Sequence, residues 1–134
     1  APIVTDLRRT TQAMVRLQLD DLLEPIDAPC PCGSALLAVR GVEGRAGDVW
    51  RWGDVAITPR EVEDAVSRAV GADVDWRAVG SAGGVWIEAV AHEDMAVAAV
   101  EMLLAARGVK PPVGSAAMGP MEGFKRRRVR WRDG

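Results

Sequence analysis

The most reactive side chains in the sequence are two cysteines one residue apart, Cys30 and Cys32, in the run EPIDAPCPCGS. Two thiolates could supply half of a zinc site, but a structural zinc normally has four ligands. His92, the only histidine, falls at the start of a distant predicted helix. The spacing is too tight for an ordinary structural disulfide, which fits a reducing compartment. We therefore predict a rigid turn at these cysteines and no stoichiometric zinc.

Three charged residues have side chains suited to binding a nucleotide. Asp21 ends the run RLQLDD, Arg45 lies in EGRAGD, and Lys125 begins the basic run KRRRVRWR. A carboxylate can accept hydrogen bonds from two hydroxyls, an arginine binds phosphate with a planar fork, and a lysine is a compact, mobile charge. Each also has a simpler interpretation: Asp20 and Asp21 end a strand, EGRAG is a turn, and Lys125 opens a solvated tail.

The net charge of -2 conceals an uneven distribution. Six of the eight residues from Lys125 to Arg132 are basic, whereas the first 124 residues contain 11 basic and 18 acidic side chains. A basic tail that carries Trp131 could bind nucleic acid through phosphate contacts and stacking. However, the body of the chain is acidic and has no aromatic-rich strand of the RNA-recognition kind, so nucleic acid is the weaker interpretation.

The length and composition limit the class of protein. A chain of 134 residues that is 49% hydrophobic can bury one modest core, or one domain plus a fragment of another. The longest apolar run, from Met95 to Ala106, is interrupted by Glu101 and is shorter than the roughly 20 residues that a membrane span needs. With no basic-then-apolar leader, we expect a cytoplasmic protein without a membrane partner.

The first third of the chain is predicted to be rich in β-strand. IVTDL is followed by a polar turn and then by AMVRLQLDDLL, whose apolar residues recur near period two. A turn region with three prolines and a glycine precedes the apolar run LLAVRGV. We expect residues 1–44 to be a β-rich segment, residues 45–48 a hinge and residues 49–134 a separate domain.

The rest of the chain alternates strands with two helices. We expect a hairpin around Gly53, then a helix from Pro59 to about Val70 that Gly71 stops. A second hairpin contains the connection SAGG. The second helix starts at His92 and ends at Gly108, with the final strands in VGSAAM and RRVRW. The inward stripe expected for this helix comprises Met95, Ala98, Ala99, Met102, Leu103 and Ala106.

This order predicts an α+β fold, with a small β-rich N-terminal segment followed by a two-helix, ferredoxin-like α/β sandwich. Both helices should cover one face of the sheet. Trp76 and Trp86 lie on opposite strands of the second hairpin and are expected in the core. Trp50, Trp52 and Trp131 are expected at an edge that meets a partner domain.

Four stretches, in this order, resemble the C-terminal region of adenylate-forming ligases of the phenylacetate-coenzyme A ligase type. They are VTDLRRTTQAMVRLQLDDLLEP, PCPCGS, VEGRAGDV and ITPREVEDAV. Such enzymes have a large N-terminal domain that ends in a strand with an aspartate and in a Pro-Cys-x-Cys-Gly turn. A Gly-Arg-x-Asp-Asp hinge and a small C-terminal lid domain follow. The resemblance covers essentially the whole chain.

The resemblance implies roles for several residues. Asp21 takes the position of the family's ribose-binding aspartate, and Arg16 that of an arginine on the same strand. Arg45 takes the position of the hinge arginine near the nucleotide. Gly53 resembles part of the loop that lines the pantetheine channel, although this chain has one more residue before Pro59. Lys125 resembles the lid lysine that stabilises charge at the α-phosphate, although Phe124 separates it from Gly123.

At the hinge itself the chain departs from the family. Gly47 stands where similar ligases carry an aspartate, and only the following Asp48 is retained. Because glycine relaxes the limits on φ, we expect a hinge that rotates more freely.

The resemblance also defines what the chain lacks. The phosphate loop, the acyl pocket and the adenine-binding segments belong to the family's large domain and do not occur here. We therefore predict a lid domain that is inactive alone, whose intact enzyme would use ATP and coenzyme A. Its expected partners are a ligase N-terminal domain in the same or another chain, and a second copy when isolated. The alternative is a stand-alone module that binds a separate adenylating chain, or nucleic acid through the basic tail.

Overall fold

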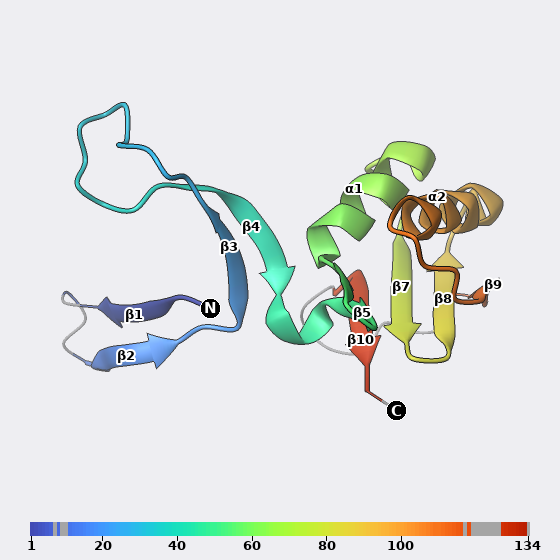
Figure 1. The fold of residues 1–134 in the computed structure, drawn as a ribbon, viewed down its shortest axis with the longest axis horizontal. Helices are drawn as coiled ribbons and strands as arrows, with labels where there is room; N and C mark the ends of the chain where they lie inside the picture. Colours follow the sequence, from blue (N-terminus) through green and yellow to red (C-terminus); the bar gives the residue numbers. More distant parts are fainter. Residues whose placement is uncertain (7, 9–10, 117, 119–126, 134) are drawn as a thin grey trace. The chain divides into compact units, whose positions relative to one another are not determined.

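The computed structural model describes residues 1–6, 8, 11–116, 118 and 127–133, and Figure 1 shows the fold. The chain forms two compact units, residues 1–46 and residues 47–134. The boundary falls within the short 3-10 helix η1 (Ala46–Asp48) and within the expected hinge. Its action as a hinge stays a prediction. Each unit is described by itself.

The first unit consists of two antiparallel strand pairs. β1 (Ile3–Asp6) pairs with β2 (Met14–Gln18), and β3 (Asp21–Pro25) pairs with β4 (Val39–Arg45). None of the described hydrophobic residues of this unit is buried, and several are largely open to solvent. The most exposed are Ile3, Val15, Leu36 and Leu37, at 62–81%. The β-rich character predicted for residues 1–44 is confirmed, but the unit has no core of its own.

The run AMVRLQLDDLL contains two strands. β2 ends at Gln18 and β3 begins at Asp21, so the chain breaks between them at Leu19 and Asp20. The break is held by backbone bonds, because the Leu19 amide donates to the Pro2 carbonyl at 2.9 Å and the Ala46 amide donates to the Asp20 carbonyl at 2.8 Å. Period-two alternation across the run could not reveal this change of partner strand.

The second unit contains the predicted order of strands and helices. A short hairpin precedes a four-stranded sheet of order β10-β7-β8-β9, in which β7 and β8 are antiparallel and each edge strand is parallel to its neighbour. The elements are β5 (Trp50–Trp52), β6 (Val55–Ile57), α1 (Pro59–Val70), β7 (Trp76–Ser81), β8 (Gly84–Ala89), α2 (Glu93–Ala106), β9 (Val113–Ser115) and β10 (Val129–Arg132). The α+β class is confirmed.

One hydrophobic core lies between the sheet and the two helices, which lie side by side (Figure 1). Along β7, burial alternates strictly, so Trp76 and Ala78 face the core while Arg77 and Val79 point to the opposite side. The helices contribute residues at helical spacing, namely Val62, Val66 and Val70 from α1 and Ala96, Val100 and Leu104 from α2. Both helices therefore cover one face of the sheet, as predicted.

The inward stripe predicted for α2 is wrong by one position. Met95 and Met102 are 49% and 74% exposed, whereas Ala96 and Val100 are fully buried. The helix carries apolar side chains on most of its surface, so its sequence pattern does not single out one face. The face that packs on the sheet is the one that carries Ala96, Val100 and Leu104.

Two of the tryptophan predictions are also wrong. Trp86 is 58% exposed, and Trp50 is fully buried, with its indole Nε1 donating to the Arg130 carbonyl at 2.8 Å. Trp76 is buried as expected. Three tryptophan rings form a row of edge-to-face contacts. The ring centroids of Trp50 and Trp52 are 5.9 Å apart, and those of Trp52 and Trp131 are 5.2 Å apart.

The ends of α1 follow from local sequence. Thr58 caps the helix: its hydroxyl accepts from the Glu61 amide at 3.3 Å, and the Glu61 carboxylate accepts from the Thr58 amide at 2.8 Å. Pro59 occupies the first turn, and Gly71 ends the helix with φ 96°. The predicted bounds of this helix are confirmed.

Replacing Thr58 by alanine should lower the free energy of unfolding by about 1 kcal/mol, because the cap hydroxyl satisfies an otherwise unpaired amide. Denaturant unfolding of the wild type and of Thr58→Ala measures this difference. Thr58→Ser keeps the hydroxyl and should lose less than half as much. Equal losses in both variants would contradict a capping role.

Among the described residues, no helix combines the length and the apolar character needed to cross a membrane.

Candidate functional site

Two of the predicted nucleotide-binding residues lie opposite each other in the first unit. Asp21 begins β3 and Arg45 ends β4, and the two are direct partners in the antiparallel ladder. Partner residues in such a ladder have their Cβ atoms about 5 Å apart and project to the same face. The fold therefore places a carboxylate, which accepts hydrogen bonds, beside a guanidinium, which donates them. Such a pair can bind the hydroxyl and phosphate groups of one ligand.

The resemblance implied that Arg16 and Asp21 lie on the same strand, and this is wrong. Arg16 lies on β2, and its backbone adopts the left-handed region with φ 51°. Its amide donates to the Thr5 hydroxyl of β1 at 3.1 Å. A non-glycine residue in this region is uncommon and marks an irregular strand. Its role in binding stays a prediction that the described contacts leave untested.

The hinge residues differ from expectation in their backbone. Gly47 lies in the 3-10 helix η1 and is not among the glycines with positive φ, so its conformation there does not require glycine. Asp48 is the only buried charged residue among the described ones, at 8% exposure. Its Oδ2 atom lies 3.8 Å from Nη1 of Arg127. Asp48 is thus held within the second unit.

Gly53 has a clear backbone reason to be glycine. It forms the two-residue connection of the β5–β6 hairpin with Asp54, between the paired Trp52 and Val55, and has φ 58°. Space around its Cβ position is open, with no atom within 4 Å. The hairpin predicted around Gly53 is confirmed, and its role in a pantetheine channel stays a prediction. Lys125 lies outside the described residues.

Sequence reasoning missed a cluster of arginines on the sheet. A small cavity of about 50 Å³ is lined by Arg77, Val79, Glu88, Arg127, Arg130 and Arg132. The cluster forms because β10, the end of the basic run, is an edge strand beside β7. The signal in the sequence was the alternation RRVRWR, which puts arginines on one face of a strand. The second half of the basic run is therefore part of the sheet.

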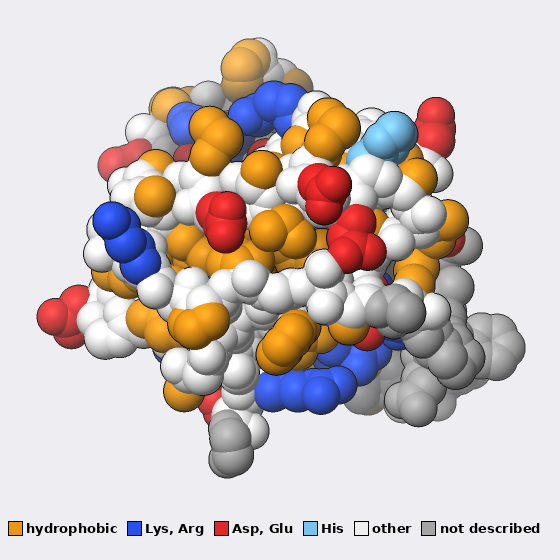
Figure 2. Space-filling model, turned by 90° about the vertical axis from the view of Figure 1, so that its right-hand side faces the viewer, with side chains coloured by type: hydrophobic (Ala, Val, Ile, Leu, Met, Phe, Trp, Pro, Cys, Tyr) orange, Lys and Arg blue, Asp and Glu red, His pale blue; other side chains and the backbone are white. Residues whose placement is uncertain are grey.

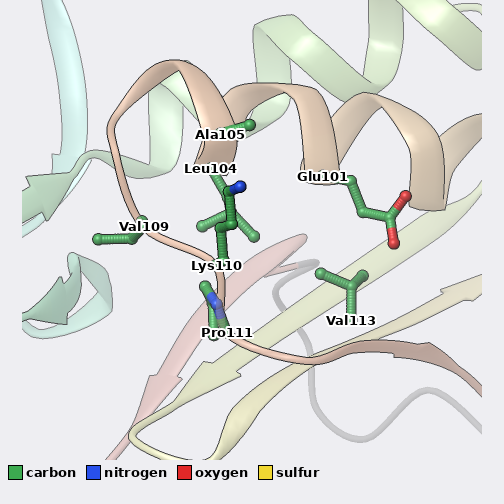
Figure 3. Close-up of a pocket in the computed structure, with 7 residues that line it drawn as sticks. All are labelled: Glu101, Leu104, Ala105, Val109, Lys110, Pro111 and Val113. Carbon is green, nitrogen blue, oxygen red and sulfur yellow. The ribbon is translucent and has the colours of Figure 1, made fainter.

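A second cavity is mostly apolar and lies between the end of α2 and β9 (Figure 3). Its volume is about 260 Å³, and its lining residues are Glu101, Leu104, Ala105, Val109, Lys110, Pro111 and Val113. Figure 2, which views the molecule from this side, shows a hollow of hydrophobic side chains with acidic side chains beside it. It offers one carboxylate and one ammonium, which are too few polar groups to define a reaction.

The two cysteines lie in a turn, as predicted. The Gly33 amide donates to the Cys30 carbonyl at 2.9 Å, and Gly33 has φ 76°. Both thiols are free, and their Sγ atoms are 2.8 Å apart. The hydrogen bond with the Cys30 thiol lowers the pKa of Cys32, and a hydrogen bond with the backbone of Ser34 lowers it further. Among the described residues, no group of three or more His, Cys, Asp or Glu side chains could hold a metal ion.

Cys32 should react with iodoacetamide faster at pH 7 than an unperturbed exposed thiol, because the thiolate is the nucleophile and a lowered pKa raises its fraction. Cys30→Ala removes the main cause, so the pH midpoint of Cys32 alkylation should rise toward the ordinary thiol value. Mass spectrometry of the alkylated chain over pH 5–9 measures the midpoint. An unchanged midpoint in Cys30→Ala would show that Cys30 does not tune this thiol.

Comparisons with known proteins give one consistent result. No family model matches the sequence, and no curated protein matches it. Among solved structures, 2-hydroxyisobutyryl-CoA ligase in the postadenylation state with R3-HIB-AMP is similar to this chain with a TM-score of 0.63 and 25% identity. The same ligase with 2-HIB-AMP gives 0.62 and 25%. Its open conformation with 2-HIB-AMP and CoA gives 0.54 and 23%, a likeness of fold alone.

The extent of the match is asymmetric. It covers 99% of this chain in all three structures but only 31–32% of the ligase. The chain is thus similar in structure to one part of an adenylate-forming CoA ligase and spans about a third of its length. Both units lie within the matched region.

Proposed function

We propose that this chain is the C-terminal region of an adenylate-forming acid-coenzyme A ligase of the phenylacetate-coenzyme A ligase type. In this proposal residues 1–44 are the end of the large domain, residues 45–48 are the hinge, and residues 49–134 are a ferredoxin-like lid. The observation that carries the proposal is the match to 2-hydroxyisobutyryl-CoA ligase over 99% of this chain at 25% identity. The absence of a buried hydrophobic core among the described residues of 1–46 supports it, because a large domain would cover those strands.

The proposed reaction has two steps. A carboxylate oxygen attacks the α-phosphate of ATP, which forms an acyl-adenylate and releases pyrophosphate. The thiol of coenzyme A then attacks the acyl carbon, forms the thioester and releases AMP. Asp21 accepts hydrogen bonds from the ribose hydroxyls, and Arg45 donates to the nucleotide beside it. Arg16 adds a second cation on this side of the nucleotide.

The remaining roles belong to the second unit. Lys125 stabilises negative charge at the α-phosphate during adenylation, and Gly53 lines the pantetheine channel during thioester formation. In this proposal the acyl pocket and the phosphate loop belong to the large domain, so we expect the isolated chain to form no acyl-adenylate. ATP and coenzyme A are cofactors of the intact enzyme only.

A chimera tests this function. The matched third of 2-hydroxyisobutyryl-CoA ligase is replaced by this chain, and formation of the CoA thioester is measured with the acid named for that ligase. The chimera should form thioester, whereas the truncated ligase alone should not. Asp21→Ala and Arg45→Ala should each reduce the rate about 10–100-fold, which is the loss expected for one hydrogen bond to a charged group.

Arg40 provides the matched control within the same strand pair. Its Nη1 atom donates to the Glu24 carboxylate at 2.8 Å, so Arg40→Ala also removes an arginine from a cross-strand pair. Its side chain is 70% exposed, and such pairs contribute little to stability. Arg40→Ala should keep at least half of the chimera's rate. A folded chimera without thioester formation, or equal losses in the Arg40 and Arg45 variants, would contradict the proposal.

A further inference from the structure

The connection between β3 and β4 carries two free thiols that have no role in the proposed ligase function. Cys30 and Cys32 are the first and third residues of a four-residue turn, which closes where the Gly33 amide donates to the Cys30 carbonyl at 2.9 Å. Pro31 takes the second position, where its fixed φ suits such a turn. Because the closing bond is local, the turn itself brings the two thiols together.

The two thiols are in direct contact. Their Sγ atoms are 2.8 Å apart, and one thiol donates a hydrogen bond to the other. Cys32 is exposed, whereas Cys30 is half-buried. An exposed thiol can meet a reagent from solution, and a second thiol beside it can then attack the adduct that forms. Redox-active cysteines commonly combine an accessible attacking thiol with a neighbouring resolving thiol in this way.

Cys32 is the thiol suited to attack first. The hydrogen bond with the Cys30 thiol lowers the pKa of Cys32, and the hydrogen bond with the Ser34 backbone lowers it further. The thiolate is the form of cysteine that attacks a disulfide, so a lowered pKa raises the reactive fraction at neutral pH. Exposure and thiolate character thus favour the same residue, and Cys30 is left as the resolving thiol.

A disulfide between these two residues would be easy to reduce. A bridge between cysteines one residue apart closes a very short loop, so it adds little stability and strains the bond. Strained or exposed disulfides have the more oxidising potentials, and they are the labile ones. In reducing compartments disulfides are typically transient. The pair is therefore suited to cycle between a dithiol and a disulfide, and not to cross-link the fold permanently.

We propose that Cys30 and Cys32 form a thiol–disulfide exchange site, whose substrate is a small disulfide such as oxidised glutathione. The Cys32 thiolate attacks one sulfur of the small disulfide, whose S–S bond breaks and releases one thiolate. That thiolate takes the proton of Cys30. The Cys30 Sγ atom then attacks Sγ of Cys32 and expels the second thiolate, which takes up the proton that Cys32 had given to solvent. The pair loses two electrons, and the small disulfide is reduced to two thiols.

The exchange site does not depend on the ligase proposal. The turn lies beyond the end of the β3–β4 ladder at which Pro25 pairs with Val39, whereas Asp21 and Arg45 pair at the other end. None of the residues proposed to bind the nucleotide takes part in the exchange. Failure of the ligase chimera therefore leaves the results below unaffected, and the two proposals fail separately.

Equilibration of the full 134-residue chain with mixtures of reduced and oxidised glutathione, with EDTA present, tests the proposal. Alkylation with iodoacetamide followed by mass spectrometry separates the free dithiol, the mixed disulfide with glutathione and the intramolecular disulfide. In excess oxidised glutathione we expect the intramolecular disulfide as the main product, with the mixed disulfide at about a tenth of it or less. Transfer to excess reduced glutathione should restore the dithiol.

Single-cysteine variants separate the two roles. Cys30→Ser keeps the attacking thiol and should accumulate the mixed disulfide with one glutathione, because no second thiol resolves it. Cys32→Ser keeps only the less exposed thiol, which should form its mixed disulfide about threefold or more slowly than Cys30→Ser at neutral pH. Ser34→Ala is the matched control in the same connection. Ser34 acts on Cys32 through its backbone, which alanine keeps, so this variant should oxidise at the wild-type rate.

Three results would overturn the proposal. One is a wild-type chain that stays a free dithiol in excess oxidised glutathione while its circular dichroism shows it folded. Another is a wild type that accumulates the mixed disulfide to the same extent as Cys30→Ser, which would show that Cys30 does not resolve it. The third is a disulfide between two chains in place of the intramolecular one, which the mass of the unreduced product would reveal.

Discussion

Replacing Trp50 by alanine should lower the free energy of unfolding of the second unit by about 3–5 kcal/mol. The indole is fully buried at the centre of the core, and its Nε1 atom donates to the Arg130 carbonyl at 2.8 Å. The substitution removes a large apolar volume and leaves that carbonyl without its partner. Since small domains are stable by about 5–15 kcal/mol, the loss is a large part of the total. Denaturant unfolding followed by circular dichroism measures it.

Two further variants make this experiment specific. Trp86→Ala removes an indole that is 58% exposed and should cost about 1 kcal/mol or less. Gly80→Ala adds a Cβ atom 2.9 Å from three atoms of the Trp50 ring, so it should destabilise the wild type by about 1–3 kcal/mol. In the Trp50→Ala background the same change should cost much less, because the clashing ring is gone. Additive losses would show that Gly80 and Trp50 are not coupled.

Deleting residues 1–44 should convert a self-associating chain into a monomer. Among the described residues, the buried hydrophobic core lies within residues 49–129, whereas eight of the large hydrophobic residues exposed by 36% or more lie in the first unit. These are Ile3, Val4, Val15, Leu17, Leu36, Leu37, Val39 and Val42. Exposed strands with apolar side chains pair readily with other copies. Sedimentation should therefore give a dimer or larger species for the full chain and a monomer for the truncated one.

The thermal midpoint provides the control for this deletion. Because the first unit contributes no residue to the described core, the truncated chain should unfold within a few degrees of the full chain. Leu36→Ser with Leu37→Ser, in the most exposed stretch, should weaken association without changing the midpoint. A full-length chain that remains monomeric at high concentration, with the amides of residues 1–44 protected from exchange, would refute this prediction.

Local signals were sufficient to predict the elements of the second unit. Thr58, Pro59 and Gly71 define α1 through a side-chain cap, a fixed φ and a terminal positive φ, which all act within a few residues. The hairpin at Gly53 was equally local. Such features need no knowledge of the partner strands.

Pairing between distant strands could not be read from the sequence. The Trp76 and Trp86 prediction failed because the hairpin register pairs Trp76 with Ala89 and Trp86 with Val79, which puts the two rings on opposite faces. The arginine cluster requires β10 to lie parallel to β7, although paired residues such as Val129 and Ala78 are more than fifty positions apart in the chain. By contrast, the ladder that joins Asp21 to Arg45 places two residues together that only the resemblance had related.

Arg45 lies in the first unit, just before the boundary with the second, and this position determines which contacts a rotation of the second unit would change. Arg45 is the last residue of β4, held opposite Asp21, and the boundary falls one residue later, between Ala46 and Gly47. A rotation of the second unit about this boundary would carry Asp48 and Gly53 with it and leave Arg45 beside Asp21. A reactive intermediate bound by the pair would then keep these contacts throughout the rotation. The part of its binding free energy that comes from this pair would then be the same before and after the turn.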